Sequence, residues 1–322
     1  MPTRPLAYEV VDVFTDRAFA GNPLAVVYAA EGLSDAQLLS LAMEFNLSET
    51  TFPQPLTAAE REAGADYRLR IFTPAGELPF AGHPTLGTAW ALRRRGTIEA
   101  GFRVQSCGAG LIGVDVPADP QSPVSLTATP RDAARELGVR QRDEVASLVR
   151  LTPSDIVGAA YLAGCGLTWL YLRVRPAAVS RARPASRRVD EVELGQASLV
   201  DPLEGVCVYA VLDADASSAP GRDGGPTDLE VNARVFVPGL GIPEDPATGS
   251  AAAGLGLVLV AAGVARRDGE TSYRITQGVD MGRPSLLLGR VEAQAGEAVR
   301  CHVSGQVVAV ASGTIAIPPI RG

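Results

Sequence analysis

Glu49 lies in the segment NLSETTF (46–52), where its carboxyl group is flanked by the aromatic residues Phe45 and Phe52. A carboxyl group beside apolar surface is desolvated, which raises its pKa and suits it to removing and returning a proton near neutral pH. We therefore predict that Glu49 is a general acid/base. The segment taken alone is also compatible with a surface carboxylate or a helix-capping group.

Two other stretches predict helices that begin in the same unusual way. They are FAGHPTLGTAW (80–90) and EDPATGSAAAGLG (244–256), and they lie about half a chain apart. Each runs from a turn rich in Gly and Pro into small residues, so each presents unpaired backbone N–H groups at a helix N-terminus, where anions bind. A substrate that carries a carboxylate could sit between two such helix starts.

Polar residues accompany both predicted helix starts. His83, which is one of only two histidines, stands at the first, and Asp245 precedes Ser250 at the second. If the starts face each other, His83 and Asp245 can exchange hydrogen bonds with one bound molecule, and Gly82, Gly249 and Ser250 can offer backbone N–H groups. A satisfied core histidine and a turn-forming Asp-Pro remain the alternatives for these two residues.

The composition excludes several classes of enzyme. The chain has 322 residues and no lysine, so all 29 basic side chains are arginine. Schiff-base catalysis, pyridoxal phosphate attachment and a P-loop all require a lysine amine. Gly254 and Gly256 at the second predicted helix do not fit the GxGxxG pattern, and no GxSxG pattern occurs, which disfavours dinucleotide-dependent redox chemistry and serine hydrolysis.

Charge, cysteines and hydropathy limit the partners. The net charge of -7 disfavours nucleic acid. The two histidines and four cysteines form no CxxC or HExxH pattern, so no metal site is expected. The chain begins without the pattern of a secretory signal, and its longest apolar stretch, near 250–263, is too short to span a bilayer. We expect a cytoplasmic protein with reduced cysteines and no membrane partner.

The hydrophobic pattern predicts two halves of similar construction. Each half combines alternating strands with one of the two helices, and the second helix, GSAAAGLGLVLVAAG, is apolar on every side. Such a helix is expected to be buried all round and wrapped by a curved sheet, although a surface helix packed on one side is the alternative. The expected strands are 7–14, 24–28, 67–72, 102–106 and 111–116, then 161–164, 168–174, 206–212, 233–237, 286–293 and 306–317.

A Pro-rich break, PADPQSP, suggests where the halves divide. We predict an N-terminal domain over 1–128 with Glu49 and His83, and a C-terminal domain over 129–322 with Asp245 and Ser250. The last strand could return to the first domain. Segments 131–147, 180–200 and 217–226 are rich in charged or loop-forming residues, and none of them looks catalytic.

Five ordered motifs carry a resemblance over nearly the whole chain. The chain resembles the PhzF-like isomerases, the phenazine-biosynthesis branch of the diaminopimelate epimerase superfamily. The motifs are VDVFTDRAFAGNPLAVV (11–27), MEFNLSETTF (43–52), RIFTPAGELPFAGHPTLGTAW (70–90), EDPATGSAAAGLG (244–256) and QGVDMGRPS (277–285). The regions 131–147 and 180–228 look expanded, which leaves the substrate open.

The resemblance implies an α+β fold of the diaminopimelate epimerase type, with two pseudo-symmetric domains, each a barrel-like mixed sheet around a central helix. It implies an active site in the cleft between the domains, usually a homodimer, and proton chemistry without a cofactor. Glu49 aligns with the family's catalytic glutamate. His83, Asp245, Gly82 and Ser250 fall on positions that bind and orient the substrate.

The residues at the two helix starts separate two mechanisms. Epimerase relatives place a cysteine at each start, whereas this chain reads AGH and ATGS. Inverting a stereocentre is easiest with a base on each face, but moving a double bond needs one group that removes a proton and returns it elsewhere. We therefore expect an isomerase that shifts a proton and double bond in a small carboxylate, such as the dihydrohydroxyanthranilate of phenazine synthesis. A racemase or epimerase, or a non-catalytic small-molecule-binding protein, is the alternative.

Overall fold

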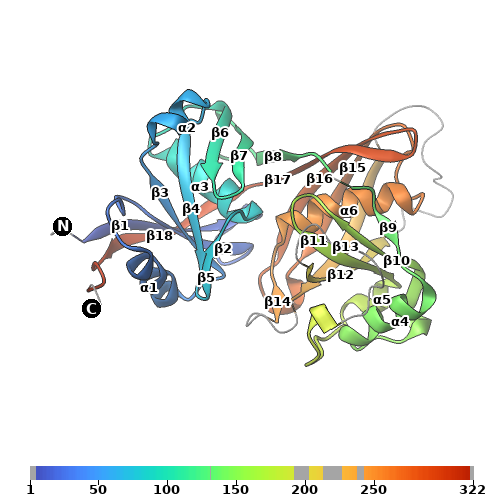
Figure 1. Ribbon diagram of the computed structural model, residues 1–322. Helices are drawn as coiled ribbons and strands as arrows, with labels where there is room; N and C mark the ends of the chain where they lie inside the picture. Colours follow the sequence, from blue (N-terminus) through green and yellow to red (C-terminus); the bar gives the residue numbers. More distant parts are fainter. Residues whose placement is uncertain (1–4, 131, 192–202, 213–226, 238–242, 320–322) are drawn as a thin grey trace. The chain divides into compact units, whose positions relative to one another are not determined.

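The computed structural model describes residues 5–130, 132–191, 203–212, 227–237 and 243–319 (Figure 1). The loop expected at 217–226 and part of the 180–200 segment lie outside these residues. The chain divides into two compact units: unit 1 is Met1–Leu126 with Ser304–Gly322, and unit 2 is Thr127–Val303. The boundary at Leu126 lies close to the expected division at residue 128, and the C-terminal segment belongs to unit 1, as the expectation for the last strand allowed, because that strand pairs with the first strand of the chain.

Unit 1 is a mixed sheet with one central helix. The first strand pairs antiparallel with the last strand and with the second, and the second runs parallel to the third. The elements are β1 (Leu6–Val13), β2 (Asn22–Val27), α1 (Asp35–Phe45), β3 (Glu49–Gln54), α2 (Ala58–Glu62), β4 (Tyr67–Thr73), β5 (Gly76–Leu78), α3 (Gly82–Arg94), β6 (Gly101–Cys107), β7 (Gly110–Val116), β8 (Val124–Ala128) and β18 (Val307–Ile315).

Unit 2 is built in the same way around a second helix. Its elements are β9 (Arg135–Glu136), α4 (Val139–Leu148), β10 (Ile156–Gly164), β11 (Thr168–Val174), α5 (Pro176–Val179), β12 (Leu203–Leu212), β13 (Thr227–Phe236), β14 (Glu244–Asp245), α6 (Gly249–Ala261), β15 (Gly269–Gln277), β16 (Ser285–Gln294) and β17 (Glu297–Gly305), with three short 3₁₀ turns at Pro153–Asp155, Val189–Glu191 and Val279–Met281.

The two units repeat one topology. In unit 1, β1 pairs antiparallel with β2, β2 is parallel to β3, β3 pairs antiparallel with β4, and β4 is parallel to β6, which pairs antiparallel with β7. In unit 2 the same steps join β10, β11, β12, β13, β15 and β16. The short strands β5 and β14 then occupy equivalent places, each directly before the central helix. The predicted pseudo-symmetry is therefore present in the strand order.

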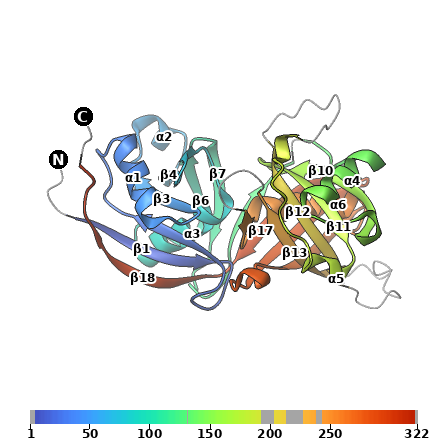
Figure 2. The ribbon, with the colours of Figure 1, turned by 90° about the horizontal axis from the view of Figure 1, so that it is seen from below.

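The two central helices are enclosed by their own sheets, as Figures 1 and 2 show. Residues 82–92 of α3 and 249–260 of α6 are all buried, so the prediction of a helix buried on every side is correct for α6. Small residues make this possible. A Cβ atom at Gly87 would collide with Val13 and Leu24, and one at Gly254 would collide with the hydroxyl group of Tyr171. Glycine at these positions lets strands approach the helix backbone closely.

Each expected strand has a counterpart in the structure, and the structure contains further strands that periodicity did not reveal. The segment of Glu49 begins a strand, β3, and β15 and β17 were not predicted. Part of the 131–147 region forms the amphipathic helix α4, which packs Val145 and Leu148 into a hydrophobic cluster of unit 2. No helix in the described ranges is both long enough and apolar enough to cross a bilayer.

Candidate active site

Glu49 is placed by a helix end and a strand start. Helix α1 stops at Asn46, which caps it in the left-handed conformation with φ 50°. The chain then turns so that Glu49 becomes the first residue of β3, opposite Leu24 of the parallel strand β2. The side chain of Glu49 is only 15% exposed. The predicted acid/base residue is therefore largely withdrawn from bulk solvent within its own unit.

His83 lies against Glu49. It is the second residue of α3, its side chain is 6% exposed, and its Nε2 atom lies 3.5 Å from Oε2 of Glu49. Burial lowers the pKa of His83 to about 3, and it outweighs the opposing effect of a contact with the backbone carbonyl of Pro23. The imidazole is therefore neutral at physiological pH, and it meets the carboxyl group as a polar neighbour without forming a full ion pair.

Two residues that the sequence did not single out complete this group. Asn22, the first residue of β2, is fully buried, and its Nδ2 atom lies 3.3 Å from Nδ1 of His83. Ser48 donates to Oδ1 of Asn22 across 3.1 Å. Both residues lie inside motifs that the sequence displayed, FAGNP and NLSE, but nothing local indicated that they meet a histidine 61 residues away. Asn22, Ser48, Glu49 and His83 form what we name the Glu49 group.

The helix start in unit 2 carries a different set of contacts. Asp245 is half-buried at the end of β14, and the N-cap residue Thr248 donates to its Oδ2 atom across 2.5 Å. Gln277 at the end of β15 donates to the backbone carbonyl of Asp245 across 2.8 Å and to Oγ1 of Thr248 across 3.1 Å. The N-cap hydroxyl is thereby turned toward Asp245 and does not cap α6.

Ser250 and Gly249 occupy the first turn of α6. Both are buried, and Oγ of Ser250 accepts a hydrogen bond from Nε1 of Trp169 across 3.2 Å. Neither α3 nor α6 has an acidic residue in its first turn or a side-chain cap, which is consistent with the expectation that their N–H groups serve a ligand. Gly82 holds the corresponding first position of α3. Asp245, Thr248, Ser250 and Gln277 form what we name the Asp245 group.

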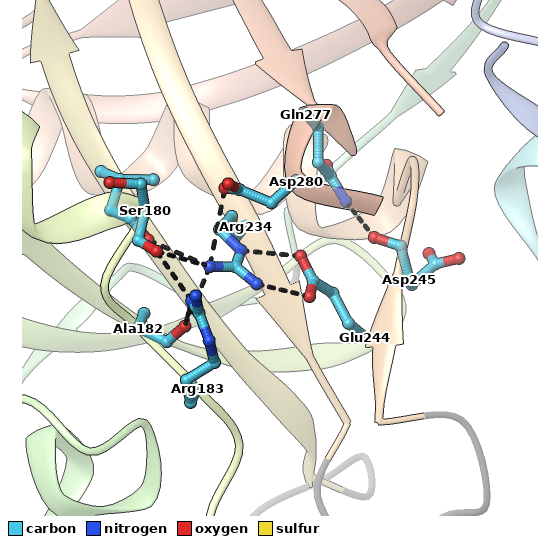
Figure 3. Close-up of polar contacts among 9 residues, drawn as sticks. Ser180, Ala182, Arg183, Arg234, Glu244, Asp245, Gln277 and Asp280 are labelled. Atoms are coloured by element: carbon cyan, nitrogen blue, oxygen red, sulfur yellow. Dashed lines mark hydrogen bonds and ion pairs between the residues drawn. The ribbon is translucent and has the colours of Figure 1, made fainter. Parts of the chain in front are cut away.

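Arg234 on β13 holds the short strand β14 in place. Its side chain is 6% exposed and makes a two-pronged ion pair with Glu244, with nitrogen–oxygen distances of 2.7 and 2.6 Å (Figure 3). Its Nη1 atom also donates to the backbone carbonyl groups of Val179, Ser180 and Ala182. A guanidinium group with this many partners is strongly fixed, because it can satisfy its donors only in this position.

The ion pair determines where Asp245 points. Glu244 and Asp245 are adjacent in β14, so their side chains leave the strand on opposite faces. Figure 3 shows Glu244 directed at Arg234 and the carboxylate of Asp245 directed away from it. The pairing of Arg234 with Glu244 was not predicted, although both residues lie in segments that the sequence highlighted as strand and motif.

The structure therefore places the predicted residues in two sets. In unit 1, Glu49 and His83 are in contact, and Gly82 is next to His83 in the chain. In unit 2, the residues near the start of α6 are Asp245, Gly249 and Ser250. Among the described residues, no cluster of three or more His, Cys, Asp or Glu side chains could hold a metal ion. The roles of the six predicted residues stay predictions, and their arrangement supplies the geometry for testing them.

The repeated topology and the two enclosed helices define a class of protein: an α+β fold of the diaminopimelate epimerase type. Residues 11–313 match the sequence model of the family described as phenazine biosynthesis-like protein, PhzC-PhzF, and the chain belongs to this family. The resemblance proposed from the five motifs is thereby confirmed.

Named relatives agree with this assignment. The chain is 31% identical to trans-2,3-dihydro-3-hydroxyanthranilate isomerase of Pseudomonas chlororaphis over 329 residues, which are 96% of this chain and 99% of the relative. A predicted epimerase of Pseudomonas aeruginosa superimposes with a TM-score of 0.74 at 28% identity, covering 96% and 99% of the two chains. A PhzF-family protein of Bacillus anthracis superimposes with a TM-score of 0.78 at 21% identity, covering 98% and 100%. The protein is an isomerase.

Proposed function

We propose that the protein is a cofactor-independent isomerase that moves one proton, and with it a double bond, within a small carboxylate. A cyclic amino-hydroxy acid such as trans-2,3-dihydro-3-hydroxyanthranilate is the substrate class we favour. The observation that carries the proposal is the contact between the withdrawn carboxyl group of Glu49 and the buried His83, at 3.5 Å. The name of the Pseudomonas chlororaphis relative supports the choice of substrate class.

Glu49 acts in this proposal as the single base and acid. Its carboxylate removes a proton from one carbon of the substrate, and the electron pair of that C–H bond moves into the adjacent unsaturated system. The carboxylic acid that forms then returns a proton to a different carbon of that system. One proton leaves and one is added, so no oxidant, reductant or second base is required.

A neutral His83 keeps Glu49 available for this task. A protonated histidine at this distance would pair with the carboxylate and lower its pKa, which would weaken it as a base. Because burial lowers the pKa of His83 to about 3, the ring stays uncharged at neutral pH. His83 therefore offers a hydrogen bond to the reacting groups and adds no positive charge beside Glu49.

The polar groups of the substrate are bound and oriented in this proposal by four residues: Gly82, Asp245, Gly249 and Ser250. The first turns of α3 and α6 have no acidic residue and no side-chain cap, so their N–H groups can accept a substrate carboxylate. Asp245 is half-buried and held by Thr248 and Gln277, and its carboxylate can accept from an amino or hydroxyl group of the substrate.

The proposal is tested by following trans-2,3-dihydro-3-hydroxyanthranilate in heavy water by ¹H NMR. We expect the wild-type protein to convert it to a product with a relocated double bond and to need no added metal or coenzyme. The Glu49→Gln variant keeps the shape of the side chain but cannot carry a proton, so it should convert the substrate about 10²- to 10⁴-fold more slowly. Equal turnover by that variant would remove Glu49 from the assigned role.

The racemase or epimerase alternative is distinguished by its product. It predicts a stereoisomer with every double bond in its original place, which chiral chromatography separates from the relocated product. A non-catalytic binding protein predicts a rise in melting temperature with the carboxylate but no conversion, because a ligand stabilises the native state by mass action. The same substrate incubation therefore decides among the three.

We further propose that the protein works as a homodimer in the cytoplasm. All four cysteines are free thiols, which is consistent with a reducing compartment. The resemblance to the PhzF-like isomerases supports the dimer. Sedimentation velocity at micromolar concentration tests it, and a sedimentation coefficient of a 33.5 kDa monomer would contradict it.

A further inference from the structure

Asn22 occupies an unusual position for a buried amide, because it contacts the ring of the histidine that faces Glu49. Its side chain has no exposed surface, and its two polar ends point to different partners. Nδ2 lies 3.3 Å from Nδ1 of His83, and Oδ1 accepts from the hydroxyl group of Ser48 across 3.1 Å. Asn22 thus links Ser48, which directly precedes β3, to His83 at the start of α3.

The identity of the two ends decides where the imidazole carries its proton. An amide nitrogen only donates hydrogen bonds, and a neutral imidazole has one nitrogen that donates and one that accepts. If Nδ2 of Asn22 donates to Nδ1, and the carbonyl group of Pro23 beside the ring does not accept a proton from that atom, the proton of the ring resides on Nε2. That atom makes no hydrogen bond within the described residues and lies 3.5 Å from Oε2 of Glu49. The N–H of the ring is therefore directed to the side where Glu49 lies.

We propose that Asn22 is a positioning residue that holds His83 in the neutral Nε2–H tautomer, so that His83 serves the reaction as a hydrogen-bond donor beside Glu49. The catalytic part of this inference rests on the proposed function, whereas the tautomer itself does not. Ser48 supports Asn22 by occupying Oδ1, which keeps the amide from rotating to present its oxygen to the ring. In the rotated orientation the oxygen would accept from Nδ1–H, and Nε2 would become an acceptor.

The tautomer can be measured directly, because the chain has only two histidines. A long-range ¹H–¹⁵N correlation spectrum of the full-length labelled protein at pH 7.5 distinguishes Nε2–H from Nδ1–H by its cross-peak pattern. His302, which contacts Thr127 and Glu292, is assigned by the loss of its signals in the His302→Gln variant. We expect His83 to show the Nε2–H pattern. An Nδ1–H pattern, with the ring donating to the carbonyl of Pro23 instead, would overturn the proposal.

The Asn22→Asp variant tests causation. It has nearly the same shape but offers only acceptors to Nδ1, so we expect His83 to change to the Nδ1–H tautomer or to become protonated. With trans-2,3-dihydro-3-hydroxyanthranilate as substrate, kcat should fall by about 10- to 100-fold, because the donor beside Glu49 is lost or redirected. KM should change much less, and the pH dependence of kcat should shift. An unchanged His83 pattern in this variant would refute the role of Asn22.

Thr51→Val provides the matched control. Thr51 on β3 pairs with Thr88 on α3 across 2.9 Å, so it is also a buried polar link between the two elements, but it does not touch His83. We expect this variant to keep the Nε2–H pattern and the wild-type kcat. If both variants altered the His83 pattern equally, Asn22 would be no more than a packing residue. If Glu49→Gln retained full activity while the tautomer stayed Nε2–H, the proposed function would fail and the assignment of the tautomer would stand.

Discussion

The two central helices begin with similar sequences, but a neutral imidazole lies at the start of one and a carboxylate group lies before the start of the other. The start of α3 has a buried, uncharged ring in contact with the amide of Asn22. Before the start of α6, the carboxylate of Asp245 accepts from the hydroxyl group of Thr248, its backbone carbonyl accepts from the amide of Gln277, and its neighbour Glu244 belongs to a buried ion pair. Both arrangements use a strand residue to hold the residue at the helix start. In the proposed function, unit 1 moves the proton and unit 2 binds the polar groups of the substrate.

A reason for this division lies in the cost of burying charge. A charge withdrawn from water is tolerated only when it is paired and hydrogen-bonded. Unit 2 supplies that environment, because Arg234 and Glu244 neutralise each other and Thr248 and Gln277 hold Asp245. Unit 1 leaves His83 neutral, which keeps it from pairing with Glu49 as a cation.

The largest effects are expected when the carboxylate groups of Glu49 and Asp245 are removed one at a time. Glu49→Gln should lower kcat by about 10²- to 10⁴-fold, which is the contribution of a general acid/base. Asp245→Asn should act mainly on kcat/KM by weakening binding. Steady-state kinetics with trans-2,3-dihydro-3-hydroxyanthranilate measure both. If Asp245→Asn lowered kcat as much as Glu49→Gln, the assignment of different tasks to the two units would be wrong.

The buried ion pair of unit 2 is expected to have the next largest effect. Arg234→Met leaves Glu244 charged and nearly buried, and it removes the donor from three backbone carbonyls, so the free energy of unfolding should fall by about 3–5 kcal/mol. Urea unfolding measures this loss. The double variant Arg234→Met/Glu244→Gln should recover part of it, because position 244 then carries no unpaired charge, although Asp280 still lacks the partner it has 3.6 Å away in the wild type. A double variant as unstable as the single one would contradict this explanation.

The pH dependence of stability should carry a signature of unit 1. The unfolded chain protonates His83 below about pH 6.5, whereas the folded protein does so only near pH 3, so the unfolded state binds more protons between these values. The free energy of unfolding therefore decreases as the pH falls through this window, and by pH 5 the contribution of His83 is about 2 kcal/mol.

Urea unfolding at pH 7.5 and pH 5 tests this expectation. His83→Asn removes the titrating ring, so the loss of stability between the two pH values should shrink by about 2 kcal/mol relative to the wild type. His302→Asn, which changes the second histidine of the chain, should retain the wild-type dependence on pH. The same steep dependence in His83→Asn would mean that the ring is not kept neutral by burial.

The smallest effect is expected from a single hydroxyl group. Thr248→Val removes the hydrogen bond to Asp245 and should reduce the free energy of unfolding by about 1–2 kcal/mol. Because Asp245 loses one of its fixed partners, KM should also rise. Thr51→Val, which removes a buried hydroxyl pair from unit 1, should cost similar stability without changing KM. A rise in KM with both variants would show a general loss of rigidity.

Local patterns in the chain were sufficient for much of the fold. Alternation predicted most strands of both sheets, and the absence of a polar stripe predicted that α6 is enclosed. The turn before each helix indicated its start, because Gly, Pro and small residues act within a few positions of the chain. Periodicity missed β3, where Glu49 and Thr50 follow a helix end closely. It also missed β15, because the buried positions Thr271 and Gln277 are polar and weaken the apolar alternation.

The candidate reactive groups could be identified from the order of the residues alone. They are the carboxyl group in NLSETTF and two helix starts without cysteine, in a chain without lysine. Only the tertiary structure decided which groups meet, because Asn22 and His83 are 61 residues apart and are joined by sheet and helix packing. Burial, which is a property of the whole unit, makes His83 neutral. The direction of the Asp245 side chain likewise depends on the ion pair between Arg234 and the neighbouring residue Glu244. These two residues are ten positions apart in the chain but are in contact in the structure. Local sequence specifies such groups, and long-range packing sets their environment.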